Sequence, residues 1–114
     1  MFTITHVQVD FTFSCTPAQY GQMVEHVAPT IAAVPGLISK LWLIDKEHRR
    51  AGGAYLFADR AAATAYLEGP IIAQLRNNPA VTDISVRRFD VIPGPSATTR
   101  GIRAAESPTA NAVS

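Results

Sequence analysis

Two neighbouring segments of the chain carry the side chains best suited to chemistry. Lys40 and Trp42 lie two residues apart in the first segment, and Tyr55 and Phe57 lie two residues apart in the next. Because alternate residues of a β-strand point to the same face, two paired antiparallel strands could direct all four side chains into one cavity. Aromatic walls around a single cation favour a site for a planar, electron-rich or acidic small molecule.

Each of these side chains also has a structural alternative. Lys40 could hold an anionic oxygen or stabilise an enolate, or its head could simply reach solvent. Trp42 could stack on a planar substrate or fill the core. The Tyr55 phenol could act as an acid or bond a substrate oxygen, or it could bond a structural partner. We take Tyr55 and Lys40 as candidate catalytic residues, and Trp42 and Phe57 as candidates for binding substrate.

A second candidate group lies near the start of the chain. His6, Gln8 and Asp10 share one face of a predicted strand, and we expect Arg88 beside them on the last strand. An imidazole oriented by a carboxylate suits a general base, so His6 is a third candidate catalytic residue. A structural ion pair between Asp10 and Arg88 is the alternative that we favour for this face. No two histidines have metal-ligand spacing and Cys15 is the single cysteine, so we assign no metal and no internal disulfide.

Hydrophobic patterning and capping residues predict the elements that position these side chains. Alternating residues predict the first strand, and a hydroxyl residue followed by proline predicts the start of the first helix, with Pro29 inside it. The predicted elements are, in order, a strand at 5–13, a helix from 17 to 34, strands at 37–44 and 51–58, a helix after Asp59 that is interrupted at Gly69-Pro70, and a strand at 82–92. This β-α-β-β-α-β order predicts a ferredoxin-like α+β fold, a four-stranded antiparallel sheet with two helices on one face.

The other face of such a sheet would be bare and apolar. It would carry one of two sets, either Leu37, Leu41 and Leu43 or Ile38, Trp42 and Ile44. Because this is too much apolar area to leave in contact with water, we predict a homodimer in which the two sheets pack face to face.

Length and composition limit the class of protein. With 114 residues, we expect one domain over residues 1–92 and a C-terminal arm at 93–114 that packs on the partner subunit. A net charge of +1 gives no basic surface for a nucleic acid. The start lacks a signal-peptide pattern, and no apolar run reaches the roughly 18 residues of a membrane helix. We therefore expect a cytoplasmic protein that binds a small molecule and neither nucleic acid nor membrane.

Four stretches of the sequence resemble the YdhR-type monooxygenases of the dimeric α/β-barrel superfamily. They are the stretch 35–42 (PGLISKLW), the stretch 51–57 (AGGAYLF), Ala65-Tyr66-Leu67 and Phe89-Asp90-Val91. The resemblance spans residues 4 to 92 and implies a dimeric α/β barrel. It also implies that Lys40, Trp42 and Tyr55 belong to the family pattern, with Gly52 and Gly53, and it adds Tyr66 to the candidates for binding substrate. Phe57 stands where several relatives carry tryptophan.

The resemblance further implies an oxidoreductase, namely a monooxygenase that needs neither metal nor flavin. In such an enzyme the substrate itself, deprotonated to a phenolate or enolate, passes an electron to dioxygen. No glycine-rich nucleotide loop follows a strand, and no histidine follows Tyr66 and Leu67 where relatives often have one, so we expect no cofactor and no haem. The alternatives are a lyase, isomerase or cyclase, with Tyr55 as acid and Lys40 or His6 at the enolate, or a protein that binds a small molecule without turnover.

Overall fold

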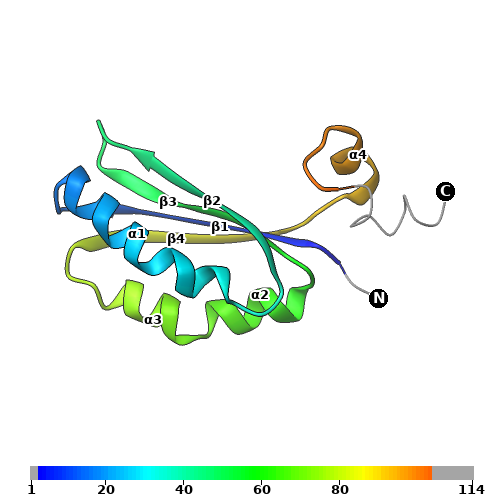
Figure 1. Ribbon diagram of the computed structural model, residues 1–114, viewed down its shortest axis with the longest axis horizontal. Helices are drawn as coiled ribbons and strands as arrows, with labels where there is room; N and C mark the ends of the chain where they lie inside the picture. Colours follow the sequence, from blue (N-terminus) through cyan, green and yellow to red (C-terminus); the bar gives the residue numbers. More distant parts are fainter. Residues whose placement is uncertain (1–2, 104–114) are drawn as a thin grey trace.

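The fold is a four-stranded antiparallel sheet with its helices packed on one face, apart from a short helix near the C-terminus (Figure 1). The computed structural model describes residues 3–103 of the chain. Its elements are β1 (Thr5–Phe13), α1 (Pro17–Ala32), β2 (Leu37–Asp45), β3 (Arg50–Phe57), α2 (Arg60–Leu67), α3 (Pro70–Arg76), β4 (Val81–Asp90) and α4 (Pro93–Thr98). The strand order is β2-β3-β1-β4. The predicted ferredoxin-like α+β fold is therefore confirmed.

The helices begin where the capping residues predict. Thr16 and Gln19 form a capping box, in which the Gln19 backbone N–H donates to Thr16 Oγ1 at 3.1 Å and the Thr16 N–H donates to Gln19 Oε1 at 2.9 Å. Asp59 caps α2 by accepting from the Ala62 N–H at 2.8 Å. The helical conformation is interrupted at Gly69, and a new helix, α3, begins there with Pro70 in its first turn. The second predicted helix is thus two short helices.

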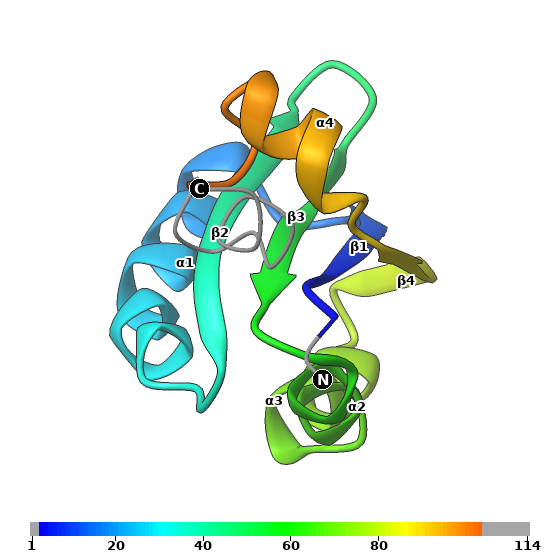
Figure 2. The same ribbon diagram turned by 90° about the vertical axis from the view of Figure 1, so that its right-hand side faces the viewer.

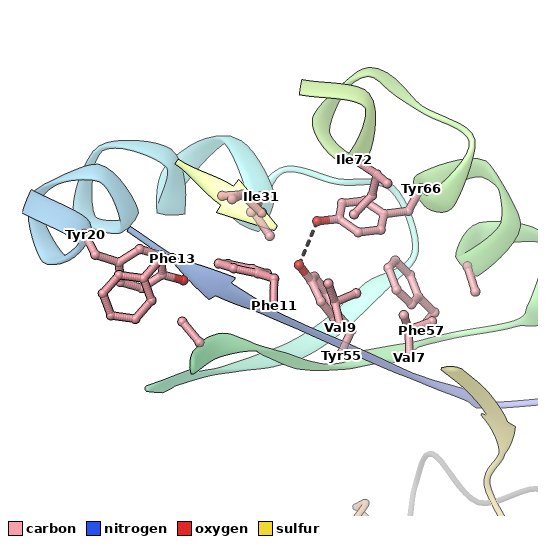
Figure 3. Close-up of a cluster of buried hydrophobic side chains, with 13 residues drawn as sticks. Val7, Val9, Phe11, Phe13, Tyr20, Ile31, Tyr55, Phe57, Tyr66 and Ile72 are labelled. Carbon is pink, nitrogen blue, oxygen red and sulfur yellow. Dashed lines mark hydrogen bonds between the residues drawn. The ribbon is translucent and has the colours of Figure 1, made fainter. Parts of the chain in front are cut away.

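The core lies between the sheet and the helices α1, α2 and α3. The helix-facing side chains of β1 are Val7, Val9, Phe11 and Phe13, each at most 4% exposed (Figure 3). They alternate with the partly exposed side chains of the same strand, as the sequence pattern predicts. Gly52 of β3 lies so close to β1 that a Cβ there would be 1.9 Å from the Val9 carbonyl oxygen.

Strand β4 presents different residues to the helices than we predicted. Val7 pairs with Arg88, so Arg88 lies on the helix-facing side, where its Nη1 donates to Thr64 Oγ1 of α2 at 2.6 Å. Asp90 shares that side and forms an ion pair with Arg60. The expectation that Arg88 lies beside His6 and Asp10 is wrong, because residues directly opposite in a ladder share a face.

The open face of the sheet carries Asp10, whose ion-pair partner is Arg50 of β3. Leu41 and Leu43 of β2 also lie there, opposite Ala54 and Gly52, and they are 67% and 40% exposed. Of the two apolar sets we considered, the open face therefore carries the first without Leu37, together with Ile38 of the second set, which lines a hollow beside Leu56.

Leu37 instead packs against the core, because the β2–β3 register shifts after it. Phe89, opposite His6, adds a third exposed apolar side chain to the open face.

The start of the C-terminal arm folds onto the chain's own sheet. Helix α4 lies on the opposite side of the sheet from α2 and α3 (Figure 2). Beyond it, Ile102 is buried and shares a hollow with Ile38 and Leu56. The remainder of the predicted arm, residues 104–114, lies outside the described residues. In the described part of the chain, no helix has the length and apolar character needed to cross a membrane.

Candidate functional site

A cavity of about 250 Å³ lies over the sheet, between helices α1 and α3. Strands β1, β2 and β3 form its floor, and its walls are mainly apolar side chains of the two helices. The wall residues include Val24, Val27 and Ile31 of α1 and Ile72 and Leu75 of α3. The described lining contains no aspartate or glutamate. An apolar space of this kind with few polar groups is typical of a small-molecule site.

Four of the six candidate residues meet in this cavity. Lys40 and Trp42 reach it from β2, Tyr55 from β3, and Tyr66 from α2. They come together because Lys40 pairs with Tyr55 in the β2–β3 ladder, which places both side chains on the helix-facing side.

Phe57 and His6 lie elsewhere. Phe57 is fully buried beneath the site, with its ring centroid 5.9 Å from that of Tyr55 and 5.5 Å from that of Tyr66. His6 lies on the open face, where its Nε2 is 3.2 Å from Gln8 Oε1. The thickness of the sheet therefore separates His6 from Lys40 and Tyr55, and Phe57 supports the two tyrosine rings.

Lys40 is the one cationic side chain that projects among aromatic rings in the described lining. Its Nζ lies 3.2 Å from the ring centroid of Trp42 and 4.4 Å from that of Tyr55. Within residues 3–103 its ammonium makes no hydrogen bond or ion pair. Burial lowers the pKa of Lys40 to about 7, because the charged form loses hydration that the rings only partly replace.

Gly53 leaves the space that the Lys40 side chain occupies. A Cβ at Gly53 would lie 2.5 Å from Lys40 Cε and 3.3 Å from Tyr55 Cε1. Gly52, the preceding residue of β3, likewise makes a close approach, there to the backbone of β1.

Tyr55 and Tyr66 form a hydrogen-bonded pair at the cavity. Their hydroxyl oxygens are 2.8 Å apart, as the dashed line in Figure 3 marks. Burial raises the pKa of both phenols, that of Tyr55 the more strongly, so both stay neutral. One hydroxyl donates to the other, and the accepting one keeps its own proton for a further bond. The pair can therefore offer one O–H to an oxygen of a ligand.

Removing either phenol of this pair should cost stability in a coupled way. We expect Tyr55→Phe and Tyr66→Phe each to lower the free energy of unfolding by about 1 to 2 kcal/mol, because the remaining buried hydroxyl loses its partner. The double variant should be less destabilised than the sum, by about 1 kcal/mol. Denaturant unfolding measures all three. Tyr20→Phe is the control, since the Tyr20 hydroxyl has no hydrogen bond among the described residues. Additive losses would contradict the coupling.

Sequence reasoning did not identify the walls of the cavity. Helical spacing places Val24, Val27 and Ile31 on the face of α1 that packs on the sheet, but it cannot show that α1 and α3 stand apart. His26 and Gln74 also border the opening, from α1 and α3 respectively, and no sequence signal marks either one. Within residues 3–103, no group of three or more histidine, cysteine or acidic side chains could bind a metal ion together.

Comparison with known proteins gives one family match and many similar structures. The family model described as "Putative mono-oxygenase ydhR" matches residues 6–102. Comparison with curated proteins finds no match.

Three of the similar structures illustrate the range of the fold. A protein of unknown function from Nitrosomonas europaea has 21% identity and a TM-score of 0.67, over 80% of this chain and 91% of that one. SnoaB, a cofactor-independent oxygenase from Streptomyces nogalater, has 16% identity and a TM-score of 0.63, over 78% and 93%. A hydroxynitrile lyase from Passiflora edulis has 14% identity and a TM-score of 0.61, over 80% and 95%. At these identities the likeness establishes the fold alone.

Proposed function

The chain belongs to the family described as "Putative mono-oxygenase ydhR", and from this premise we propose that it oxygenates a small aromatic or enolisable substrate without a cofactor. The substrate would lie in the cavity between the sheet and the helices. The observation that carries this proposal is the Lys40 amine among aromatic rings, beside the neutral Tyr55–Tyr66 pair. The fold shared with a cofactor-independent oxygenase supports it.

The side chains have separate roles in this reaction. Trp42 gives a planar substrate a ring to stack on, and Lys40 holds the oxygen of the deprotonated substrate. The Tyr55–Tyr66 pair donates a hydrogen bond to an oxygen that gains negative charge. The apolar walls exclude water, so these charges and donors act in a medium of low polarity.

The atoms and electrons of such a reaction balance without an outside reductant. The substrate anion passes one electron to dioxygen, and the substrate radical and superoxide then combine into a peroxide. Where the oxygen has joined a CH₂ carbon of the substrate, loss of water from the peroxide turns that carbon into a carbonyl. One oxygen atom enters the product, and the other leaves as water with two hydrogens from the substrate. The substrate thereby supplies all four electrons that dioxygen takes up.

Oxygen uptake with anthrone tests this function. The methylene of anthrone lies between two aromatic rings and enolises readily, so we expect oxygen consumption above the rate without protein and anthraquinone as product. One atom of labelled dioxygen should appear in the quinone. Tyr55→Phe should lower the rate by about tenfold, since it removes one hydrogen-bond donor to the reacting oxygen.

The outcomes of this experiment separate the alternatives. The fold shared with a hydroxynitrile lyase supports a lyase or a related activity, which would convert substrates without oxygen uptake. Binding of anthrone without any product over hours would instead support a protein that binds small molecules. Either result contradicts the oxygenase proposal.

We also propose that the protein is a homodimer in which the open faces of two sheets meet. Leu41, Leu43 and Phe89 lie on that face and are 67%, 40% and 52% exposed. The same face also carries the ion pair between Asp10 and Arg50. A second copy would remove the apolar side chains from water.

A further inference from the structure

We propose that Lys40 makes the cavity a receptor for the ionised form of a weakly acidic planar ligand. A phenol or enol that enters as the neutral acid gives its proton to Lys40 and remains bound as the anion. This inference rests on the proposed function, because it defines the substrate class of the same cavity. Loss of the substrate proton to Lys40 is the step that the proposed oxygenation requires before dioxygen can react.

The position of Lys40 supports this role. Its Nζ lies against the Trp42 and Tyr55 rings, so a flat ligand that enters the cavity there meets the amine directly. The amine has no hydrogen bond or ion pair within residues 3–103, and the described lining offers it no carboxylate. An anionic oxygen of a ligand would therefore be its first charged partner.

The other titratable groups of the described lining cannot replace it as the base at the rings. They are Tyr20 and His26 on α1, Tyr55 on β3 and Tyr66 on α2. Burial raises the pKa of Tyr20 to about 12 and raises those of Tyr55 and Tyr66, so these phenols stay protonated and only donate hydrogen bonds. His26 is an exposed residue at the border of the cavity, on the helix wall and not among the rings.

Near neutral pH, much of the Lys40 amine is already in the neutral form that can accept a proton. Its pKa of about 7 means that a large share of the resting protein carries the neutral amine. When an acidic ligand binds, its O–H bond breaks and an N–H bond forms on Lys40. The resulting ion pair replaces the hydration that burial removed from the ammonium.

A single positive charge also limits the kind of ligand. One ammonium neutralises one anionic oxygen, and the described lining holds no second lysine and no arginine. The site should therefore accept molecules with one acidic hydroxyl and an apolar, planar remainder. Dicarboxylates, phosphates and cations should bind poorly.

The probe para-nitrophenol tests this receptor, because its phenolate absorbs at a longer wavelength than its phenol. At about pH 6 the free probe is mainly neutral, yet we expect the probe bound to the full chain to show the phenolate spectrum. Lys40→Met should bind the probe as the neutral phenol and lower the affinity for phenolate by about 10- to 100-fold. The methyl ether para-nitroanisole cannot ionise, so wild type and Lys40→Met should bind it alike.

Lys40→Arg separates proton acceptance from charge alone. Arginine keeps its charge at every pH used here, so this variant should also bind phenolate but should never take up a proton. At about pH 8 the wild type should take up nearly one proton for each probe bound, because its amine is then neutral and the probe is already ionised. Calorimetry in two buffers of different ionisation enthalpy measures this difference.

The outcomes distinguish the receptor proposal from the oxygenase proposal. Three results would overturn the receptor proposal. They are a neutral bound probe in the wild type, a bound phenolate in Lys40→Met, and equal proton uptake by the wild type and Lys40→Arg. If neither probe binds, both the receptor proposal and the assignment of the cavity as a binding site would be overturned. Absence of oxygen uptake with anthrone, together with the expected spectra, would overturn the oxygenase and leave the receptor standing.

Discussion

Gly52→Ala should remove most of the stability of the fold. A Cβ at this position would lie 1.9 Å from the Val9 carbonyl oxygen and 2.8 Å from Asp10 Cα. Both atoms belong to the backbone of β1, which pairs on both sides in the sheet and cannot move without breaking a ladder. We expect a loss of more than about 3 kcal/mol in the free energy of unfolding, or no folded protein at all. Thermal and denaturant unfolding measure it.

Gly21→Ala is the matched control for this substitution. Gly21 lies inside α1, and a Cβ there would meet no atom within 4 Å. Alanine favours the helix over glycine, so this variant should gain up to about 1 kcal/mol. Equal unfolding curves for the two variants would show that β1 and β3 separate at little cost, contrary to the packing described above.

Leu41→Lys should convert the proposed homodimer into monomers. Leu41 is 67% exposed on the open face, and twofold symmetry places the change twice in one interface. Each substitution removes an apolar contact and brings an unpaired charge into the interface, so we expect the dissociation constant to rise by more than about 100-fold. Analytical ultracentrifugation at micromolar concentration measures it.

Ile44→Lys is the control for this change. Ile44 is on the same strand and is 44% exposed, but it lies on the helix-facing side, opposite Ala51. It should leave the association unchanged. A wild-type protein that sediments as a folded monomer would contradict the dimer, and loss of association in both variants would contradict the assignment to the open face.

The sequence predicted the regular elements well because their signals are local. Strand β1 has the predicted bounds, since its apolar and polar residues alternate without interruption. The capping box at Thr16 and the cap at Asp59 set the starts of α1 and α2 for the same reason. Lys40 and Tyr55 share a face, as the sequence allowed for two antiparallel strands joined by a short turn.

The wrong placement of Arg88 shows where local signals end. The β1–β4 ladder has an irregularity between Asp10 and Thr12, and the alternation along β4 gives no indication of it. A shift of one residue exchanges the two faces of a strand, so parity alone could not assign Arg88 to the helices. The Arg88 contact with Thr64 depends on the packing of α2, which the sequence does not express.

The outcome for the aromatic residues has a different cause. Phe57 has the same parity as Tyr55, so the expected face is right, but α2 brings Tyr66 over it. The Tyr55–Tyr66 bond joins two elements, and only packing decides that these phenols meet. The sequence therefore indicated that Tyr55 and Phe57 share a face, but it left open which face of β2 carries Trp42, and it left the depth and partners of the site undetermined.

The break at Gly69 makes one wall of the cavity a separate short helix from α2. Lys40 and Tyr55 are anchored in paired strands, whereas α3 is a wall of seven residues that begins anew after α2. Substitutions within α3 can enlarge or narrow the cavity while the ladder that holds the amine and the phenol stays intact. In the proposed enzyme, the scaffold could thus acquire new ligands through one short segment while Lys40 and Tyr55 stay in place in the paired strands.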